Sequence, residues 1–245
     1  MKRIRMILLV ILPAQLLAQE QFIFEGRIEY ERRINLHRQI DPSEDESWLK
    51  AVLPTVPNFH TSNFTLLFNK DEAIYKPQGE IAPVTAAFLF GPAKENIVLT
   101  EFNKATKTSY KSVFEKRYRI EDSIKAMKWR VTNEKRTIAG LECRKAVTII
   151  CDSVYVVAFY AEEIPVSGGP ESFAGLPGMI LGVAIPRLHT TWFATKVVLS
   201  PPAVNEFATK NRGEKINDAG LENTLKSSLG DWGKYGERNI WWILL

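Results

Sequence analysis

The sequence predicts a mainly β fold: an antiparallel, curved sheet, either sandwich-like or an open or half barrel, with a short C-terminal helix. Three observations lead to this prediction. Several stretches alternate apolar and polar residues with the period of two that a half-buried strand requires. Residues 154–160 and 179–185 show no such alternation, which is typical of strands covered on both faces. The tail alone changes to a helical period.

Length and composition indicate one domain behind a leader segment. With 245 residues and 45% hydrophobic content, the chain can bury a substantial core. In residues 1–18, three basic side chains precede a short apolar run, and Ala18 offers a small residue for cleavage, as in a secretory signal peptide. The apolar run is shorter than the ~20 residues of a spanning helix. We therefore expect cleavage near Ala18 and a single β domain over 19–245, with a helical tail from about residue 214.

Net charge argues against nucleic acid as a partner. Cleavage would remove three of the 32 basic residues and leave 29 against 28 acidic ones. A mature chain so close to neutral, without a basic stripe, lacks the electrostatic footprint of a nucleic-acid-binding protein.

The alternating and apolar stretches predict the order of the strands. We expect strands at 22–36, 63–68, 73–76, 95–102, 106–120, 129–134, 136–140, 142–150, 154–161, 179–185 and 190–199. The first should bury the row Phe22, Phe24, Ile28, Tyr30, Ile34 and Leu36. The fifth should place Tyr110, Ser112, Phe114, Tyr118 and Ile120 on one side and Lys111, Glu115, Arg117 and Arg119 on the other. Lys116 interrupts the apolar row, which indicates an edge or a bulge.

The connections and the tail carry their own signals. We expect a short helix near 47–52, a loop over 77–91 and a hairpin turn at 151–153. Asn217 can cap a helix that carries Leu221, Leu225 and Leu229, with Gly230 as its stop. Residues 240–245 are too few to span a bilayer and predict a terminal strand or a docked end.

Residues 162–185 form the stretch around which the rest is organised, because glycine and proline specify its backbone. Leu176-Pro177-Gly178-Met179 suits a type II turn, in which Pro177 fixes φ near −65° and Gly178 takes a positive φ. The turn would deliver the chain directly into the buried strand 179–185.

No motif for catalysis, cofactor binding or metal binding is recognisable in the sequence. His37, His60 and His189 lie far apart, without ligand spacing. Cys143 and Cys151 would be too distant along one extended strand to form a disulfide, so we expect two free, partly buried thiols. Glu171 is a candidate ligand contact, although a capping or backbone-bonding carboxylate is the more ordinary role after Gly-Pro.

The same stretch resembles the GLPGLI family of exported bacterial envelope proteins. The motif here is Gly175-Leu176-Pro177-Gly178-Met179-Ile180, preceded by Glu163-Ile164-Pro165 and Gly169-Pro170-Glu171-Ser172-Phe173. Met179 replaces the second motif leucine, and Gly182 stands where many members carry an acidic residue. The resemblance covers roughly residues 110–200. It implies export in a diderm bacterium and association with outer-membrane uptake systems, but no established reaction.

The leading hypothesis is a non-enzymatic binding or accessory module, periplasmic or associated with the outer membrane, whose partner is an outer-membrane transporter or another envelope protein. Its predicted contact residues are Pro170, Glu171, Phe173, Gly175, Leu176, Pro177, Gly178, Met179 and Ile180. The motif is equally interpretable as a folding corner. The alternatives are a periplasmic lipid or lipoprotein carrier with an apolar groove, and a hydrolase that uses Glu171 and His189. No cofactor is expected.

Overall fold

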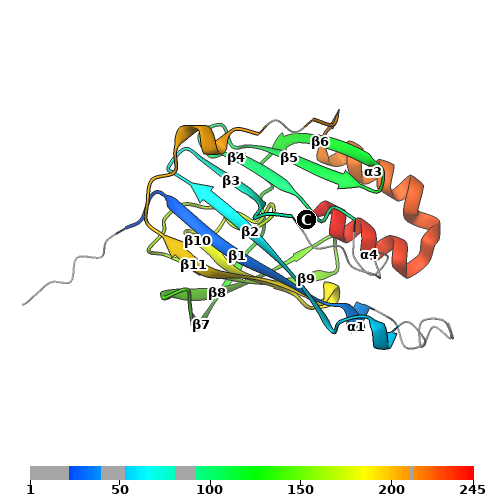
Figure 1. Cartoon of the computed structure of the whole chain (residues 1–245), viewed down its shortest axis with the longest axis horizontal. Coiled ribbons are helices and arrows are strands. Elements are labelled where there is room, and N and C mark those ends of the chain that lie inside the picture. Colours follow the sequence, from blue (N-terminus) through cyan, green and yellow to red (C-terminus); the bar gives the residue numbers. More distant parts are fainter. Residues whose placement is uncertain (1–21, 40–52, 81–91, 210–211) are drawn as a thin grey trace, which may run out of the picture.

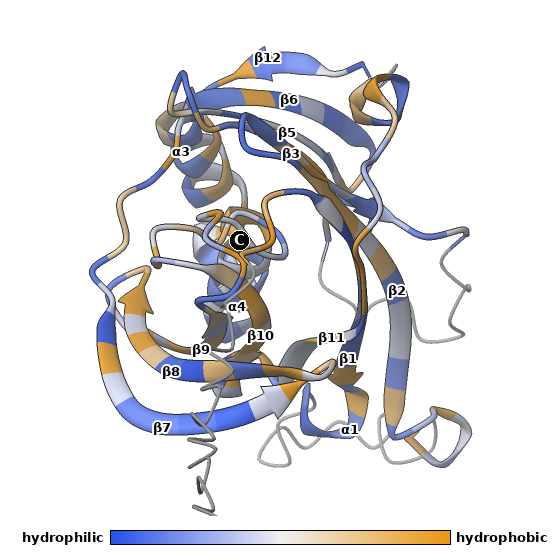
Figure 2. Ribbon diagram, turned by 90° about the vertical axis from the view of Figure 1, so that its left-hand side faces the viewer, coloured by the Kyte–Doolittle hydropathy of each residue, from blue (hydrophilic) through white to orange (hydrophobic). Residues whose placement is uncertain are grey.

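The described residues form one strongly curved sheet with helices at its opening. The computed structural model describes residues 22–39, 53–80, 92–209 and 212–245. Twelve strands pair in the order β12-β6-β5-β4-β3-β2-β1-β11-β10-β9-β8-β7. All neighbours are antiparallel except β12 and β6, which are parallel. The sheet curls into an open barrel (Figures 1 and 2), which confirms the mainly β, curved fold.

The strands are β1 Gly26–Asn35, β2 Phe59–Phe68, β3 Glu72–Pro77, β4 Ile97–Glu101, β5 Thr106–Val113, β6 Lys116–Ser123, β7 Arg130–Ile138, β8 Leu141–Ile150, β9 Val154–Ala161, β10 Met179–Ile185, β11 Thr190–Val198 and β12 Glu214–Ile216. The helices are α1 Leu36–Gln39, α3 Asp218–Leu229 and α4 Gly233–Leu244. Short 3-10 turns are η1 Leu53–Thr55, η3 Pro186–Leu188, η4 Val204–Phe207 and η5 Gly230–Trp232.

The main core lies on the concave side of the sheet. Strand β10 is buried along nearly its whole length, as its unbroken apolar run predicts. Across the interior, the Tyr30 hydroxyl donates to the Ile180 carbonyl oxygen at 2.6 Å. This hydrogen bond satisfies a buried phenol and joins β1 to β10, which are not neighbours in the sheet.

The C-terminal tail is longer and more helical than predicted. Asn217 caps α3 as expected, and its side chain accepts from the Gly220 amide at 2.8 Å. Helix α3 ends at Leu229 with Gly230 as its C-cap, as predicted, although Gly230 has a helical φ of −59° and no left-handed one. The chain then continues through η5 into α4, which was not predicted. The predicted terminal strand is therefore wrong, and the end is docked. Trp242 packs beside Trp192, and α3 and α4 lie across the opening of the sheet (Figure 2).

Two predicted strands differ in their bounds and path. Strand β1 begins at Gly26, so Phe22 and Phe24 are exposed outside it. The predicted strand 106–120 is the hairpin β5–β6, reversed beyond Val113, where Phe114 adopts φ 54°. As a result β5 buries Lys107, Ser109 and Lys111 instead of the opposite row.

The predicted cover on both faces of 154–160 is also wrong, because burial alternates along β9 and Tyr155 is 43% exposed. Strand β7 runs without the predicted break and is exposed along most of its length. It lies at the end of the described sheet.

Several predictions fall outside the described residues: the signal peptide over 1–18, the short helix near 47–52 and most of the loop over 77–91. Within the described ranges, no helix combines the length and the apolar character needed to cross a membrane.

Packing of the C-terminal helices against the core can be tested with one buried and one exposed tryptophan. Trp242 is 3% exposed in the main core, whereas Trp232 is 57% exposed on η5. Trp242→Ala should lower the free energy of unfolding by about 3–5 kcal/mol through lost burial and a cavity. Trp232→Ala should change it by about 0.5 kcal/mol or less. Urea unfolding measures both, and equal small effects would show that the tail is not part of the cooperative core.

Candidate functional site

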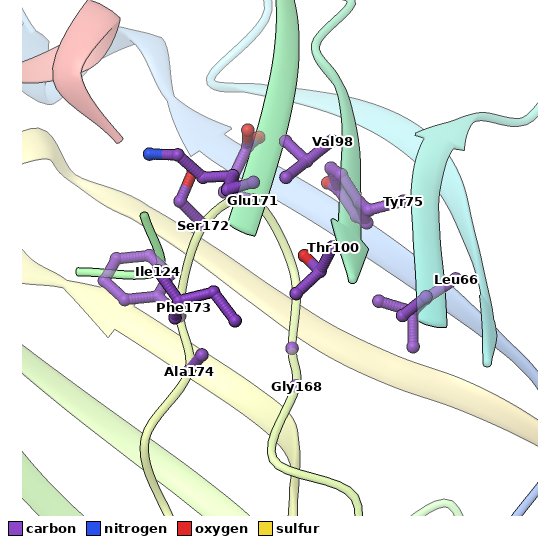
Figure 3. A pocket seen from close by; sticks show the side chains of 13 residues that line it. Leu66, Tyr75, Val98, Thr100, Ile124, Gly168, Glu171, Ser172, Phe173 and Ala174 are labelled. Carbon is purple, nitrogen blue, oxygen red and sulfur yellow. The ribbon is translucent and has the colours of Figure 1, made fainter. Parts of the chain in front are cut away.

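Residues 162–178, here called the motif loop, connect β9 to β10 inside the curl of the sheet. Figure 3 shows the tip of this loop, with Glu171, Ser172 and Phe173, facing Tyr75, Val98 and Thr100 of the sheet. Hydrogen bonds fix its path. The Gly175 amide donates to Ser167 Oγ at 2.8 Å, the Trp129 indole donates to the Ala174 carbonyl at 2.8 Å, and the Ile180 amide donates to the Gly168 carbonyl at 2.8 Å.

The motif glycines serve different purposes from those the sequence predicts. Gly175 has the positive φ, at 93°, whereas Gly178 is not among the residues with positive φ. The predicted type II turn with a left-handed Gly178 is therefore wrong. Gly178 is required by close approach instead, because an added Cβ would lie 2.2 Å from the Ala161 carbonyl oxygen. This tertiary contact leaves no trace in the local sequence pattern.

The predicted contact residues divide by burial. Gly175 and Pro177 are exposed. The other members lie in the interior: Pro170, Glu171, Phe173, Leu176, Gly178, Met179 and Ile180. Glu171 is the charged member of this buried set, and its backbone adopts φ 54°, a conformation that disfavours a side chain.

Glu171 meets an arginine and an amide inside the sheet. Its Oε2 accepts from Asn96 Nδ2 at 2.8 Å, and its Oε1 lies 3.8 Å from Arg32 Nη1. The side chains of Arg32 and Glu171 are each 1% exposed. The Arg32 guanidinium lies over the Phe64 ring, 4.7 Å from its centroid. Burial lowers the pKa of Arg32, and the negative charge of Glu171 opposes that shift.

Arg32, Tyr75, Asn96, Glu171 and Trp192 form what we call the interior polar cluster. Arg32 stands opposite Trp192 of β11 in the strand register. Burial raises the pKa of Tyr75 well above its ordinary value, and the charge of Glu171 raises it further. All five side chains are almost completely buried.

Several buried atoms in and beside the interior polar cluster have no hydrogen-bond partner among the described residues. They are Arg32 Nε, Asn96 Oδ1, Glu171 Oε1, Ser109 Oγ and Ser172 Oγ. The Trp192 indole hydrogen-bonds to the Tyr75 hydroxyl oxygen, which opposes the rise of the Tyr75 pKa. Leaving a buried polar atom without a partner costs about 1–3 kcal/mol, so a small polar guest beside these atoms would be favourable. The adjoining cavity, lined by Tyr75, Glu171 and Ser172, has about 10 Å³, room for about one water molecule.

Two inward lysines of β5 join the sheet to the tail. Lys107 Nζ contacts Asp218 of α3 at 3.1 Å, and Lys111 Nζ donates to the Ile243 carbonyl of α4 at 2.8 Å. A cation beside the last carbonyls of a helix is favourable. Burial lowers the pKa of Lys111 to about 8, Glu171 and Asp218 oppose this shift, and Lys107 adds to it.

The sequence patterns gave no prediction of a functional role for Arg32, Lys107 or Lys111. For Arg32 a signal existed, since it falls in phase with Ile28, Tyr30 and Ile34 in the buried row of β1. A charge in an apolar row is itself a sign of an interior partner.

The other candidate groups are not assembled with Glu171. His189 is exposed after the far end of β10, about 20 Å along the strand from the motif loop. Both cysteines are free, and burial raises the pKa of Cys143 to about 12, which keeps it a thiol. Within the described ranges, no group of three or more His, Cys, Asp or Glu could hold a metal ion.

Comparisons with known proteins support the fold and leave the function open. A family model described as a protein of unknown function (Porph_ging) matches residues 149–182, which include the motif loop. No curated protein matches the chain. Two crystal structures of PNGF-II, in space groups C2 and P21, match 84% of this chain with a TM-score of 0.53, at 12% and 14% identity. The chain spans only 33% and 34% of those PNGF-II chains, and the likeness shows the fold alone.

The close approach at Gly178 gives a prediction for the motif. Gly178→Ala should lower the free energy of unfolding by about 3 kcal/mol or more, because the new methyl group meets the Ala161 backbone. Pro177→Ala, at an exposed position, should cost about 1 kcal/mol or less. Chemical denaturation of both variants measures the difference. A stable Gly178→Ala protein would contradict the described backbone path.

Lys111 predicts a pH dependence of stability. Its pKa is about 8 when folded and 10.5 ordinarily, so between these values the unfolded chain binds more protons. Folded stability should therefore rise with pH in this window, by up to about 1.4 kcal/mol per pH unit relative to a Lys111→Met variant. Urea titrations of both proteins from pH 7.5 upward measure the difference, in which the titrations of other groups largely cancel. A difference that stays constant would show that Lys111 is hydrated.

Proposed function

We propose that this protein is an exported binding or accessory module of the cell envelope, without catalytic activity. Among the described residues, Arg32 and Glu171 are enclosed beside a cavity of about 10 Å³, which is too small for a hydrolase substrate or an acyl chain. The surroundings of Glu171 therefore favour neither a lipid carrier at this place nor a hydrolase built on Glu171 and His189.

The observation that carries the proposal is an open surface cleft of mixed polarity that contains exposed aromatic side chains. Phe22, Phe24 and Leu199 line it and are 51%, 40% and 63% exposed. The cleft has about 620 Å³, within the range of small-ligand and peptide sites, and Asn69, Lys70 and Asp71 supply polar groups. Lys70 Nζ lies 4.6 Å from the centroid of the Phe24 ring. Exposed aromatic side chains grouped with polar and charged groups are typical of the residues that proteins use for recognition.

The modular character has separate support. The fold matches about a third of the much longer PNGF-II chains, so it occurs as part of larger proteins. The resemblance of residues 175–180 to the GLPGLI motif supports an envelope location and a partner among outer-membrane uptake systems. In this proposal the motif loop stabilises the interior of the domain, and the surface cleft binds the partner protein.

Site-specific photo-cross-linking tests the proposal. A benzophenone amino acid at Phe24, in intact cells of the native host, should give one discrete adduct with an envelope protein that mass spectrometry can identify. The same amino acid at Ile149, which is 62% exposed on β8, is the matched control and should give none.

A Phe22→Ser/Phe24→Ser double variant, cross-linked from Leu199, should fold normally and lose the adduct. Unchanged cross-linking in that variant, or equal labelling from positions 24 and 149, would overturn the proposed role of the cleft.

A further inference from the structure

The inner face of the sheet carries more positive than negative charge. Arg32, Lys107 and Lys111 are 1%, 9% and 5% exposed, whereas the fully buried carboxylate among the described residues is Glu171, at 3%. Lys107 is matched by Asp218 and Lys111 by a neutral carbonyl. Arg32 has Glu171 as its counter-ion. The site around Arg32 is therefore built to hold one negative group.

Glu171 fills that site imperfectly. Only its Oε2 has a hydrogen bond, and the 3.8 Å between Oε1 and Arg32 Nη1 is longer than a direct hydrogen bond. Among the described residues, Arg32 Nε has no acceptor, and the Tyr75 hydroxyl, which accepts from the Trp192 indole, still has its own hydrogen to donate. The left-handed backbone at Glu171 adds strain. The Glu171 carboxylate thus neutralises the charge of Arg32 without forming a well-oriented hydrogen bond to it.

We propose that the interior polar cluster is an anion-binding site in which the Glu171 side chain is the resident ligand, and that a small carboxylate takes its place when that side chain is withdrawn. Asn96 Nδ2 and Arg32 Nη1, which now face Glu171, would be joined by Arg32 Nε and the Tyr75 hydroxyl. A free anion can orient both oxygens toward these donors, as Glu171 does not. The residues of the interior polar cluster are separate from those that line the surface cleft.

Chemical rescue tests the site. Glu171→Gly removes the carboxylate, and glycine adopts the left-handed backbone at this position without strain. A loss of stability in this variant therefore reports the missing side-chain contacts and not a strained backbone. The variant should melt at a lower temperature than the wild type. Sodium formate well above its Kd should raise its Tm by about 5 °C or more, whereas sodium chloride of equal ionic strength should not. The wild-type protein, whose site is filled, should shift by less than about 1 °C.

Two further variants locate the effect. Arg32→Met in the Glu171→Gly background should abolish the formate shift, because the main anion-binding group is gone. Glu206→Ala removes a carboxylate paired with the half-exposed Arg27, and formate should not stabilise it. If Glu171→Gly fails to fold, recovery of its circular dichroism in formate but not in chloride gives the same answer.

Equal effects of formate and chloride on Glu171→Gly, in stability or in folding, would overturn the proposal. So would a formate shift that persists without Arg32. Glu171 would then be a structural carboxylate and the cluster no binding site.

Discussion

The structure depends on one buried electrostatic contact, between Glu171 of the motif loop and Arg32 of β1. A curved sheet that does not close leaves an interior that its own strands cannot fill, and the motif loop fills part of it. The loop brings a carboxylate within 3.8 Å of a fully buried guanidinium, and this is the contact that most offsets the burial of Arg32. Either charge alone would be strongly destabilising in this interior, so each explains why the other is tolerated.

The second closure is made by the tail. Apolar side chains of α3 form a cluster with Tyr118 and Ile120 of β6, and α4 brings two tryptophans to the main core. Lys107 and Lys111 bind the two helices to β5 from within. Sheet, motif loop and tail are thus three parts of one packed unit, in which polar contacts specify positions and apolar contacts supply most of the stabilisation.

Sequence patterns predicted the strands well because alternation is local, and the buried run at 179–185 identified β10. They failed where tertiary contact decides. The role of Gly178 depends on its close approach to Ala161, which lies 17 residues earlier in the chain. The inward face of β5 was predicted wrongly because the hairpin β5–β6 was interpreted as one continuous strand. The sequence predicted part of the candidate site. Glu171 was a candidate because of its Gly/Pro-rich loop, but its contact with Arg32 forms only when the motif loop packs inside the sheet, which no local pattern indicates. Phe22 and Phe24 were predicted to lie in the core, because they continue the alternation of apolar and polar residues in β1, but they are exposed and line the surface cleft.

Strand β7 leaves one rim of the sheet without a described neighbour. A long unpaired rim of this kind offers backbone groups to any extended chain nearby, which invites uncontrolled association. Here the rim carries Glu134, Lys135 and Arg136, with Lys145 and Glu142 of β8 paired to the first two. Any chain that added itself there would have to strip water from this row of charged side chains. The charged rim thus disfavours edge-to-edge pairing in a barrel whose described strands do not close.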